Sequence, residues 1–132
     1  MAKRNVFKFE AGPVEFTVIG ISSHENDYRL SWNINEQLGF HFTQGNSLFN
    51  KAGKEFTCFA HEDEDRLLLL ISNRCDNGFL LEKYKNFDFI LKINNGLDEM
   101  EMSAWLRDLR KTPLISAAFP IPINKQILQI LG

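Results

Sequence analysis

Residues 87–122 predict a strand, a helix and a second strand in direct succession, and this order limits the folds that the chain can adopt. Residues 87–93 (FDFILKI) are mostly apolar, as expected for a buried strand. Residues 97–111 place apolar side chains on one face of a helix, with acids at its start and bases at its end, which complements the helix dipole. Pro113 ends this helix, and residues 115–121 form a last strand whose proline indicates a sheet edge.

A similar unit is predicted earlier in the chain. Residues 14–21 (VEFTVIGI) are typical of a buried strand, and residues 22–25 fit a capping box that starts a helix. Gly39 suits the left-handed position that follows a helix end, so the helix is expected to end near Leu38. Its apolar stripe recurs every four residues and is flanked by two aromatic residues: Leu30, Ile34 and Leu38, with Tyr28 and Trp32.

Between the two units the pattern predicts hairpins. Alternation favours short strands at residues 40–43 and 55–61. Residues 67–72 are apolar on both faces, which places this strand near the centre of the sheet. Asn77-Gly78 is typical of a type I′ hairpin turn, because both central positions of that turn need a positive φ.

These elements predict a single α+β domain over residues 1–132, in which residues 1–12 are frayed or add an edge strand. The expected architecture is an antiparallel-rich sheet with two main helices on one face, ferredoxin-like or ACT-like with extra central hairpins. A final short helix over residues 125–131, capped by Asn124, is expected to dock its apolar side chains on the body: Ile127, Leu128 and Leu131.

The composition narrows the class of function. Twelve Phe and two Trp supply a core without disulfides, since each buried aromatic removes roughly 150–250 Å² from water. The net charge of −2, with no basic cluster, argues against nucleic acid as a partner. The longest apolar run, residues 67–71, is too short to cross a membrane. No apolar signal segment follows the basic first residues, so a cytoplasmic protein is expected.

The sequence contains no motif for a metal, a cofactor or a catalytic group. The three His and two Cys are scattered, without a CxxC pair or an HExxH motif, so no zinc site is predicted. Residues 61–65 (HEDED) carry oxygen ligands but lack the spacing of a calcium loop. Phosphate-loop and nucleophile-elbow motifs do not occur either. We therefore assign no catalytic residue and expect no cofactor.

Residues 27–29 (Asp-Tyr-Arg), with Trp32, form the most site-like group of the first helix, and Tyr28, Arg29 and Trp32 are its candidates for ligand binding. Tyr28 and Trp32 are neighbours at i,i+4, and Arg29 between them can hold an anion or a carboxylate. The alternative is that the two rings belong to the core and the charge to a solvated face, because aromatic residues at helical spacing usually pack inside.

Asp88 is the fourth candidate for ligand binding. It stands between Phe87 and Phe89, and alternation along a strand would point its carboxylate away from both rings. A carboxylate held there needs a partner, for which Arg29 and Arg74 are available. A structural salt bridge is the favoured interpretation, and a catalytic acid or base is the alternative.

Several stretches of the chain also carry a family pattern: GIS at residues 20–22, DYRL at 27–30, LISN at 70–73 and LEKYKNFDF at 81–89. In these stretches the chain resembles the IPExxxVDY family of uncharacterised bacterial proteins. Phe87, Asp88 and Phe89 stand for the Val-Asp-Tyr of the signature, whereas Glu82 and Lys83 replace its Pro and Glu. The resemblance implies a relative without an assigned activity.

Three functions stay open. The favoured one is a small non-enzymatic domain that acts as a homo-oligomer or binds a protein partner. The second is a ligand-sensing domain that holds a small anionic metabolite near Arg29 or near the helix start at residues 96–99. The third is an enzyme that uses Asp88 with Tyr28 or His24. An exposed apolar face would favour the first, and a clustered polar pocket the second or third.

Overall fold

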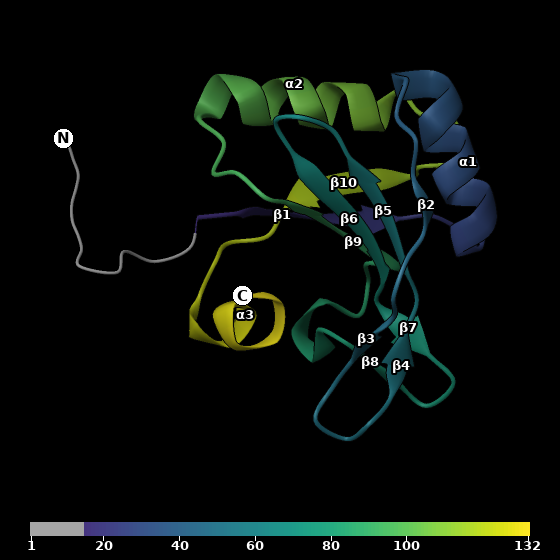
Figure 1. Cartoon of the computed structure of the whole chain (residues 1–132), viewed down its shortest axis with the longest axis vertical. Coiled ribbons are helices and arrows are strands. Elements are labelled where there is room, and N and C mark those ends of the chain that lie inside the picture. The colour runs from purple at the N-terminus through teal and green to yellow at the C-terminus, as the bar shows by residue number, and fades with distance from the viewer. Residues whose placement is uncertain (1–14) are drawn as a thin grey trace, which may run out of the picture.

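The computed structural model describes residues 15–132, so the predicted edge strand or frayed segment at residues 1–12 lies outside the described part. The described chain is α+β, as predicted, with a six-stranded antiparallel sheet and three helices (Figure 1). The sheet strands are β1 (Thr17–Ser22), β2 (Thr43–Gln44), β5 (Cys58–Glu62), β6 (Leu67–Ser72), β9 (Phe89–Ile93) and β10 (Ala117–Pro120). The helices are α1 (Asp27–Leu38), α2 (Glu99–Arg110) and α3 (Lys125–Leu131).

Two small ribbons and one short helix extend the sheet at one end. One ribbon pairs β3 (Leu48–Phe49) with β4 (Glu55–Phe56), and the other pairs β7 (Arg74–Cys75) with β8 (Gly78–Phe79). The 3-10 helix η1 (Glu82–Tyr84) leads from β8 to β9.

The sheet order is β10-β1-β9-β6-β5-β2, so β6 is an interior strand and β10 is an edge, as the sequence predicted. Residues 67–72 pair with β5 on one side and with β9 on the other. Interior strands bury both faces, which explains why β6 is apolar over residues 67–71.

The sheet separates two apolar layers. The side chains of α1 and α2 pack with one face, which confirms two main helices on one side, and α3 covers the other face (Figure 1). Ile127 and Leu131 of α3 are buried there, whereas Leu128 is largely exposed, so the prediction that all three dock was wrong for Leu128. A short helix can turn only one narrow stripe toward the sheet.

The starts of both main helices differ from the sequence prediction. The capping box at residues 22–25 is wrong, because Asn26 is the N-cap of α1 and its side chain accepts a hydrogen bond from the amide of Arg29. A capping box that the sequence analysis missed starts α2, where Asp98 and Glu101 satisfy each other's backbone amides. Gly39 ends α1 with φ 74°, as predicted.

Two details of register also differ. A hairpin forms where Asn77-Gly78 predicted one, but Gly78 pairs with Cys75 inside the ribbon, and Asp76 and Asn77 make the turn. The prediction that Phe87 and Phe89 share a face is wrong as well, since they pack into opposite layers. Strand β9 begins only at Phe89, so strand alternation does not extend back to Phe87.

Candidate functional site

A polar hollow of about 440 Å³ lies where the start of α1 meets the end of β6 and the start of β9. The loop before α1 lines it, together with Arg74 and Asp88. Its other lining side chains come from segments far apart in sequence: Thr57, Ser72 and Phe89. We call this the polar hollow.

Asp88 is held on two sides. One carboxylate oxygen pairs with the Arg74 guanidinium, and Oδ2 accepts a hydrogen bond of 2.9 Å from the amide of Ser23. The side chain of Asp88 is 17% exposed, whereas that of Arg74 is 58% exposed. Of the two partners that the sequence offered for Asp88, the structure brings Arg74 to it, and Arg29 pairs elsewhere.

Asp27 also lines the polar hollow and links the start of α1 to Thr57. Its Oδ2 accepts a hydrogen bond of 2.5 Å from the hydroxyl of Thr57, between β4 and β5, and its Oδ1 accepts one from the amide of Tyr28. The strand predicted over residues 55–61 is interrupted at Thr57, which frees this residue to reach α1. The carboxylates of the polar hollow therefore fasten the start of α1 to the sheet.

A second hollow of about 470 Å³ shares Thr57 and Arg74 with the first. Lys54, Cys75 and Asp76 are among its other lining residues. Arg74 is thus reached from both hollows, and an Arg guanidinium has five N–H donors, more than its contact with Asp88 uses. Arg74 therefore offers a small acidic group a guanidinium donor beside the predicted site residue Asp88.

The other three predicted site residues lie outside both hollows, on the outward side of α1. Tyr28 is 71% exposed and Trp32 is 57% exposed, so the prediction that they flank the buried stripe was wrong. The buried side chains of α1 are Leu30, Ser31, Asn33 and Ile34. Arg29 forms an ion pair of 3.0 Å with Glu25, four residues earlier in the loop before α1. The structure therefore separates the four predicted residues into one in the hollow and three on a helix surface.

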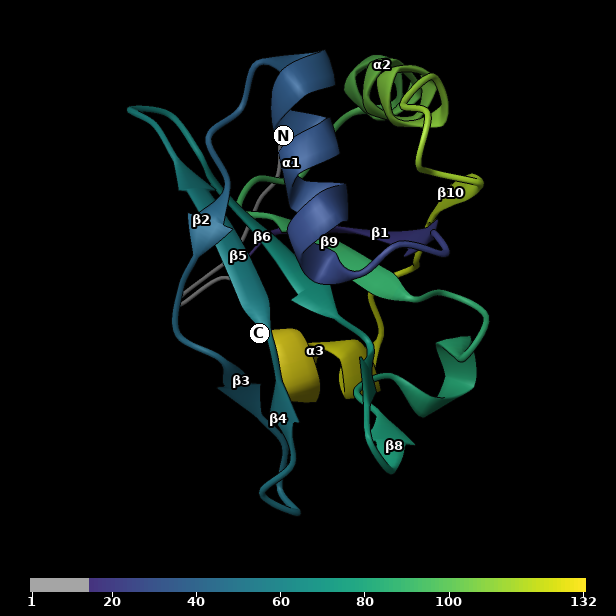
Figure 2. The ribbon, with the colours of Figure 1, turned by 90° about the vertical axis from the view of Figure 1, so that its right-hand side faces the viewer.

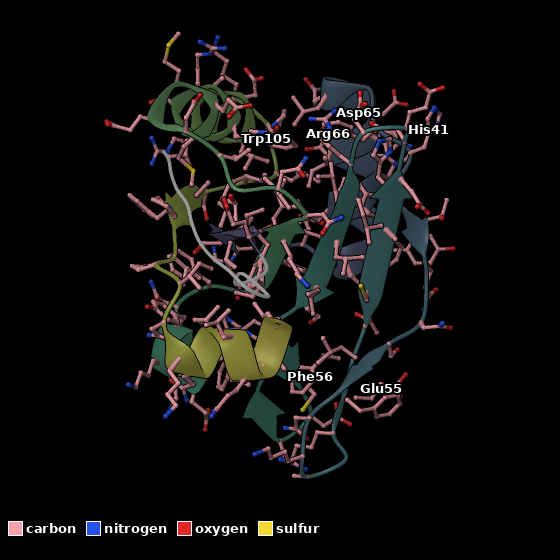
Figure 3. The ribbon with its side chains drawn as sticks, turned by 60° about the vertical axis from the view of Figure 1, so that its left-hand side comes forward. His41, Glu55, Phe56, Asp65, Arg66 and Trp105 are labelled. Atoms are coloured by element: carbon pink, nitrogen blue, oxygen red, sulfur yellow. The ribbon has the colours of Figure 1, made fainter. Side chains whose placement is uncertain are left out.

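An aromatic cluster that the sequence analysis missed lies at the opposite end of the β5–β6 hairpin. The rings of Phe40 and Trp105 stack at 5.5 Å, and the Arg66 guanidinium lies within 5.8 Å of both ring centroids. Figure 3 places Arg66 and Trp105 at the same end of the molecule, far from Glu55 and Phe56. The cluster joins the hairpin to α2, and no local sequence pattern connects residues so far apart.

Beside this cluster lies the buried ring of His61. His61 Nδ1 accepts a hydrogen bond of 3.0 Å from the backbone amide of His41, and Nε2 lies 3.2 Å from Asp63. The amide of Asp65, followed by the side chain of His61, lowers the pKa of Asp63 to about 2. These contacts fix the β5–β6 turn, which carries Arg66.

Lys92 lies under α3 on the other face of the sheet. Its ammonium donates a hydrogen bond of 2.6 Å to the carbonyl of Leu131, at the end of α3, and lies 4.9 Å from the centroid of the Phe16 ring. Burial lowers the pKa of Lys92 and raises the pKa of the neighbouring Cys58 thiol. The lysine acts as a C-terminal cap that holds α3 in place.

Replacing Asp88 with asparagine is expected to lower the free energy of unfolding by about 1 kcal/mol. The ion pair with Arg74 is lost, but water screens the exposed guanidinium, and the new side chain keeps an oxygen for the amide of Ser23. Urea denaturation measures the change. Asp108→Asn, in the exposed 3.5 Å pair with Arg107, is the matched control and should change stability by less than about 0.5 kcal/mol. Equal effects of the two substitutions would contradict a structural role for Asp88.

Within residues 15–132, no three His, Cys, Asp or Glu side chains gather where they could hold a metal ion. In the same part of the chain, none of the helices combines the length and the apolar character needed to cross a bilayer. A comparison with protein-family models finds no match to the chain, and neither does a comparison with curated protein sequences.

Proposed function

We propose that this chain is a small non-enzymatic domain that acts by self-association, through the outward surface of α1. We define this α1 face by its exposed residues Tyr28, Arg29, Trp32 and Glu36. Tyr28 and Trp32 are the observation that carries the proposal, because two large aromatic side chains stand exposed one helical turn apart. Trp, Tyr and Arg are the residues most enriched among those that dominate binding energy at protein interfaces.

The surroundings of α1 leave this face accessible. Figure 2 shows α1 lying in front of the sheet, and within residues 15–132 no other helix or strand covers its outward side. Within the described residues, the one aromatic ring near Tyr28 is that of Phe59, in an edge-on contact with a centroid distance of 6.2 Å. A partner could therefore bury both rings without first displacing part of the domain.

The edges of the sheet favour the helix face over strand addition. On β10, Arg110 donates hydrogen bonds of 3.0 and 2.8 Å from Nε and Nη2 to the carbonyl of Ala118, and Pro120 has no N–H to offer. On the opposite edge, β2 has only two residues. Occupied carbonyls, prolines and very short edge strands all discourage pairing with another chain.

The ferredoxin-like or ACT-like arrangement is part of the proposal. The strand order β10-β1-β9-β6, with α1 and α2 on one face, supports it, and β5 and β2 are then additions at one edge. Such a likeness concerns the fold and says nothing of activity. Membership of the IPExxxVDY family is also part of the proposal, and it rests on the sequence resemblance. The ion pair of Asp88 with Arg74 supports a structural role for the acid of that signature.

A ligand-sensing domain is the second candidate, and the position of Arg74 favours it. The guanidinium borders both hollows and is more than half exposed, so a carboxylate or phosphate group of a small molecule could reach it. The surrounding acids weaken this candidate, because Asp27, Asp76 and Asp88 also line the two hollows. Arg29, the residue first considered for an anion, is already paired with Glu25.

Replacing Trp32 with alanine is expected to weaken self-association about thirty-fold, since truncation removes a large aromatic anchor. Light scattering across a dilution series of the full chain measures the change in mass. Met100→Ala on α2 is the matched control, because Met100 is the more exposed apolar residue and lies on another helix. A wild-type chain that stays monomeric at every concentration would contradict self-association and favour the ligand-sensing candidate.

A further inference from the structure

We infer that two copies of this chain pair through antiparallel α1 helices, with a twofold axis at Trp32 and with Arg29 of each copy facing Glu36 of the other. The inference rests on the proposed function, because it assumes that the α1 face is the surface of association. It adds the partner, the direction of the two helices and the residues that determine specificity.

The positions along α1 carry the first step. Arg29 is three residues before Trp32 and Glu36 is four residues after it. At a rise of about 1.5 Å per residue, these two side chains lie roughly 4.5 and 6 Å from Trp32 in opposite directions along the axis. Antiparallel pairing about Trp32 therefore brings Arg29 of one copy level with Glu36 of the other, to within roughly 1.5 Å along the helix.

The same face contains all the groups involved. Tyr28, Trp32 and Glu36 follow one another at i,i+4, and Arg29 stands beside them at i,i+7 from Glu36, so one sector of the helix carries them. All four are exposed. A twofold interface uses the same patch on both copies, so a patch with an aromatic centre and opposite charges on its two sides complements itself.

The charges distinguish this direction from the alternative. In a parallel pair, Arg29 would face Arg29 and Glu36 would face Glu36, and like charges placed opposite each other are unfavourable. In the antiparallel pair, both contacts are between opposite charges. Arg29 already has Glu25 as a neighbour at 3.0 Å, and Glu36 forms no ion pair within residues 15–132. The approach of a second copy supplies Glu36 with a partner.

The size of the face sets the expected strength. A helix of 12 residues is roughly 18 Å long, so contact along α1 alone buries less surface than the interfaces of permanent dimers. The pair should therefore dissociate on dilution and bind more weakly at high salt, because its charged contacts lie at a solvent-exposed rim.

Charge reversal tests the arrangement. Arg29→Glu and Glu36→Arg are each expected to weaken the wild-type dimer about ten-fold, since each substitution turns both symmetric contacts into like-charge pairs. The double variant with both substitutions restores opposite charges across the axis and should return to within about three-fold of the wild type. Sedimentation equilibrium gives the dissociation constants, and circular dichroism checks that each variant keeps its helices.

Arg107→Glu provides the matched control, because Arg107 is equally exposed on α2, away from the α1 face. It should leave the dissociation constant unchanged. Loss in both single variants with recovery in the double variant supports the antiparallel pair. If Trp32→Ala weakens the dimer but the single reversals do not, or the double variant fails to recover, the arrangement is overturned while self-association through α1 stands. A monomeric wild type overturns both.

Discussion

Replacing Asn73 with alanine is expected to lower the free energy of unfolding by about 4 kcal/mol, because several buried hydrogen bonds are lost at once. Asn73 is fully buried, with 0% of its surface exposed. Its Nδ2 donates to the carbonyls of Tyr84 and Phe87 at 3.0 and 2.9 Å, and its Oδ1 accepts from the amide of Leu81 at 2.7 Å. Alanine removes all three bonds, so the amide of Leu81 and the carbonyl of Phe87 lose their side-chain partner, while the carbonyl of Tyr84 keeps the amide of Phe87.

The contacts of Asn73 explain how residues 81–87 keep a defined backbone conformation without regular strand pairing. One side chain replaces the partners that a neighbouring strand would supply, and the backbone of Asn73 also bonds to Leu80 and Asp88. Urea denaturation measures the loss. Asn46→Ala, at an exposed asparagine, is the control and should stay within about 0.5 kcal/mol of the wild type.

If Asn73→Ala does not fold, a second variant tests the same hydrogen bonds. Asn73→Asp preserves the acceptor for the amide of Leu81 but turns a negative charge toward the carbonyls of Tyr84 and Phe87. It should be destabilised at neutral pH and recover part of the loss in acid, where the carboxyl is protonated and can donate one hydrogen bond. A loss below about 1 kcal/mol in Asn73→Ala would contradict this account of the loop.

Replacing Gly20 with alanine is expected to cost about 3 kcal/mol of stability, because the added methyl group has no room. A Cβ at Gly20 would lie under 3.0 Å from three ring atoms of Phe87. Gly20 is in β1, between β9 and β10, so the backbone cannot move away without disturbing two strand pairings. The glycine is needed for the close approach of an aromatic ring, and thermal or urea denaturation measures the loss.

A second substitution isolates the cause. Phe87→Leu removes the ring that meets the new methyl group. Gly20→Ala should therefore lower stability by roughly 1.5 kcal/mol less in the Phe87→Leu background than in the wild type, which is a typical coupling energy between residues in contact. Gly45→Ala is the matched control, since its Cβ would meet only ordinary contacts at 3.9 Å. Equal costs of Gly20→Ala in both backgrounds would place the strain elsewhere.

The candidate site was predictable in its parts but not in its assembly. Sequence reasoning identified Asp88 and named Arg74 as one of two partners, and the structure brings these two together. It also grouped Asp88 with the residues of α1, whereas the structure leaves Tyr28 and Trp32 on a separate exposed surface. The direction of a side chain on an amphipathic helix depends on which face meets the sheet. On α1 that face also includes the polar residues Ser31 and Asn33.

Local sequence patterns were enough to predict several elements: a strand–helix unit at each end, an interior strand that is apolar on both sides, and the left-handed glycine that ends α1. These are local features, because periodicity, caps and helix ends depend on residues a few positions apart. The long-range partners depend instead on how the strands and helices pack. The ring of Phe87 against Gly20, the side chain of Asn73 inside a loop, and the stack of Phe40 with Trp105 join distant positions. They form only once the sheet order has brought those positions together, and no local pattern of residues encodes that order.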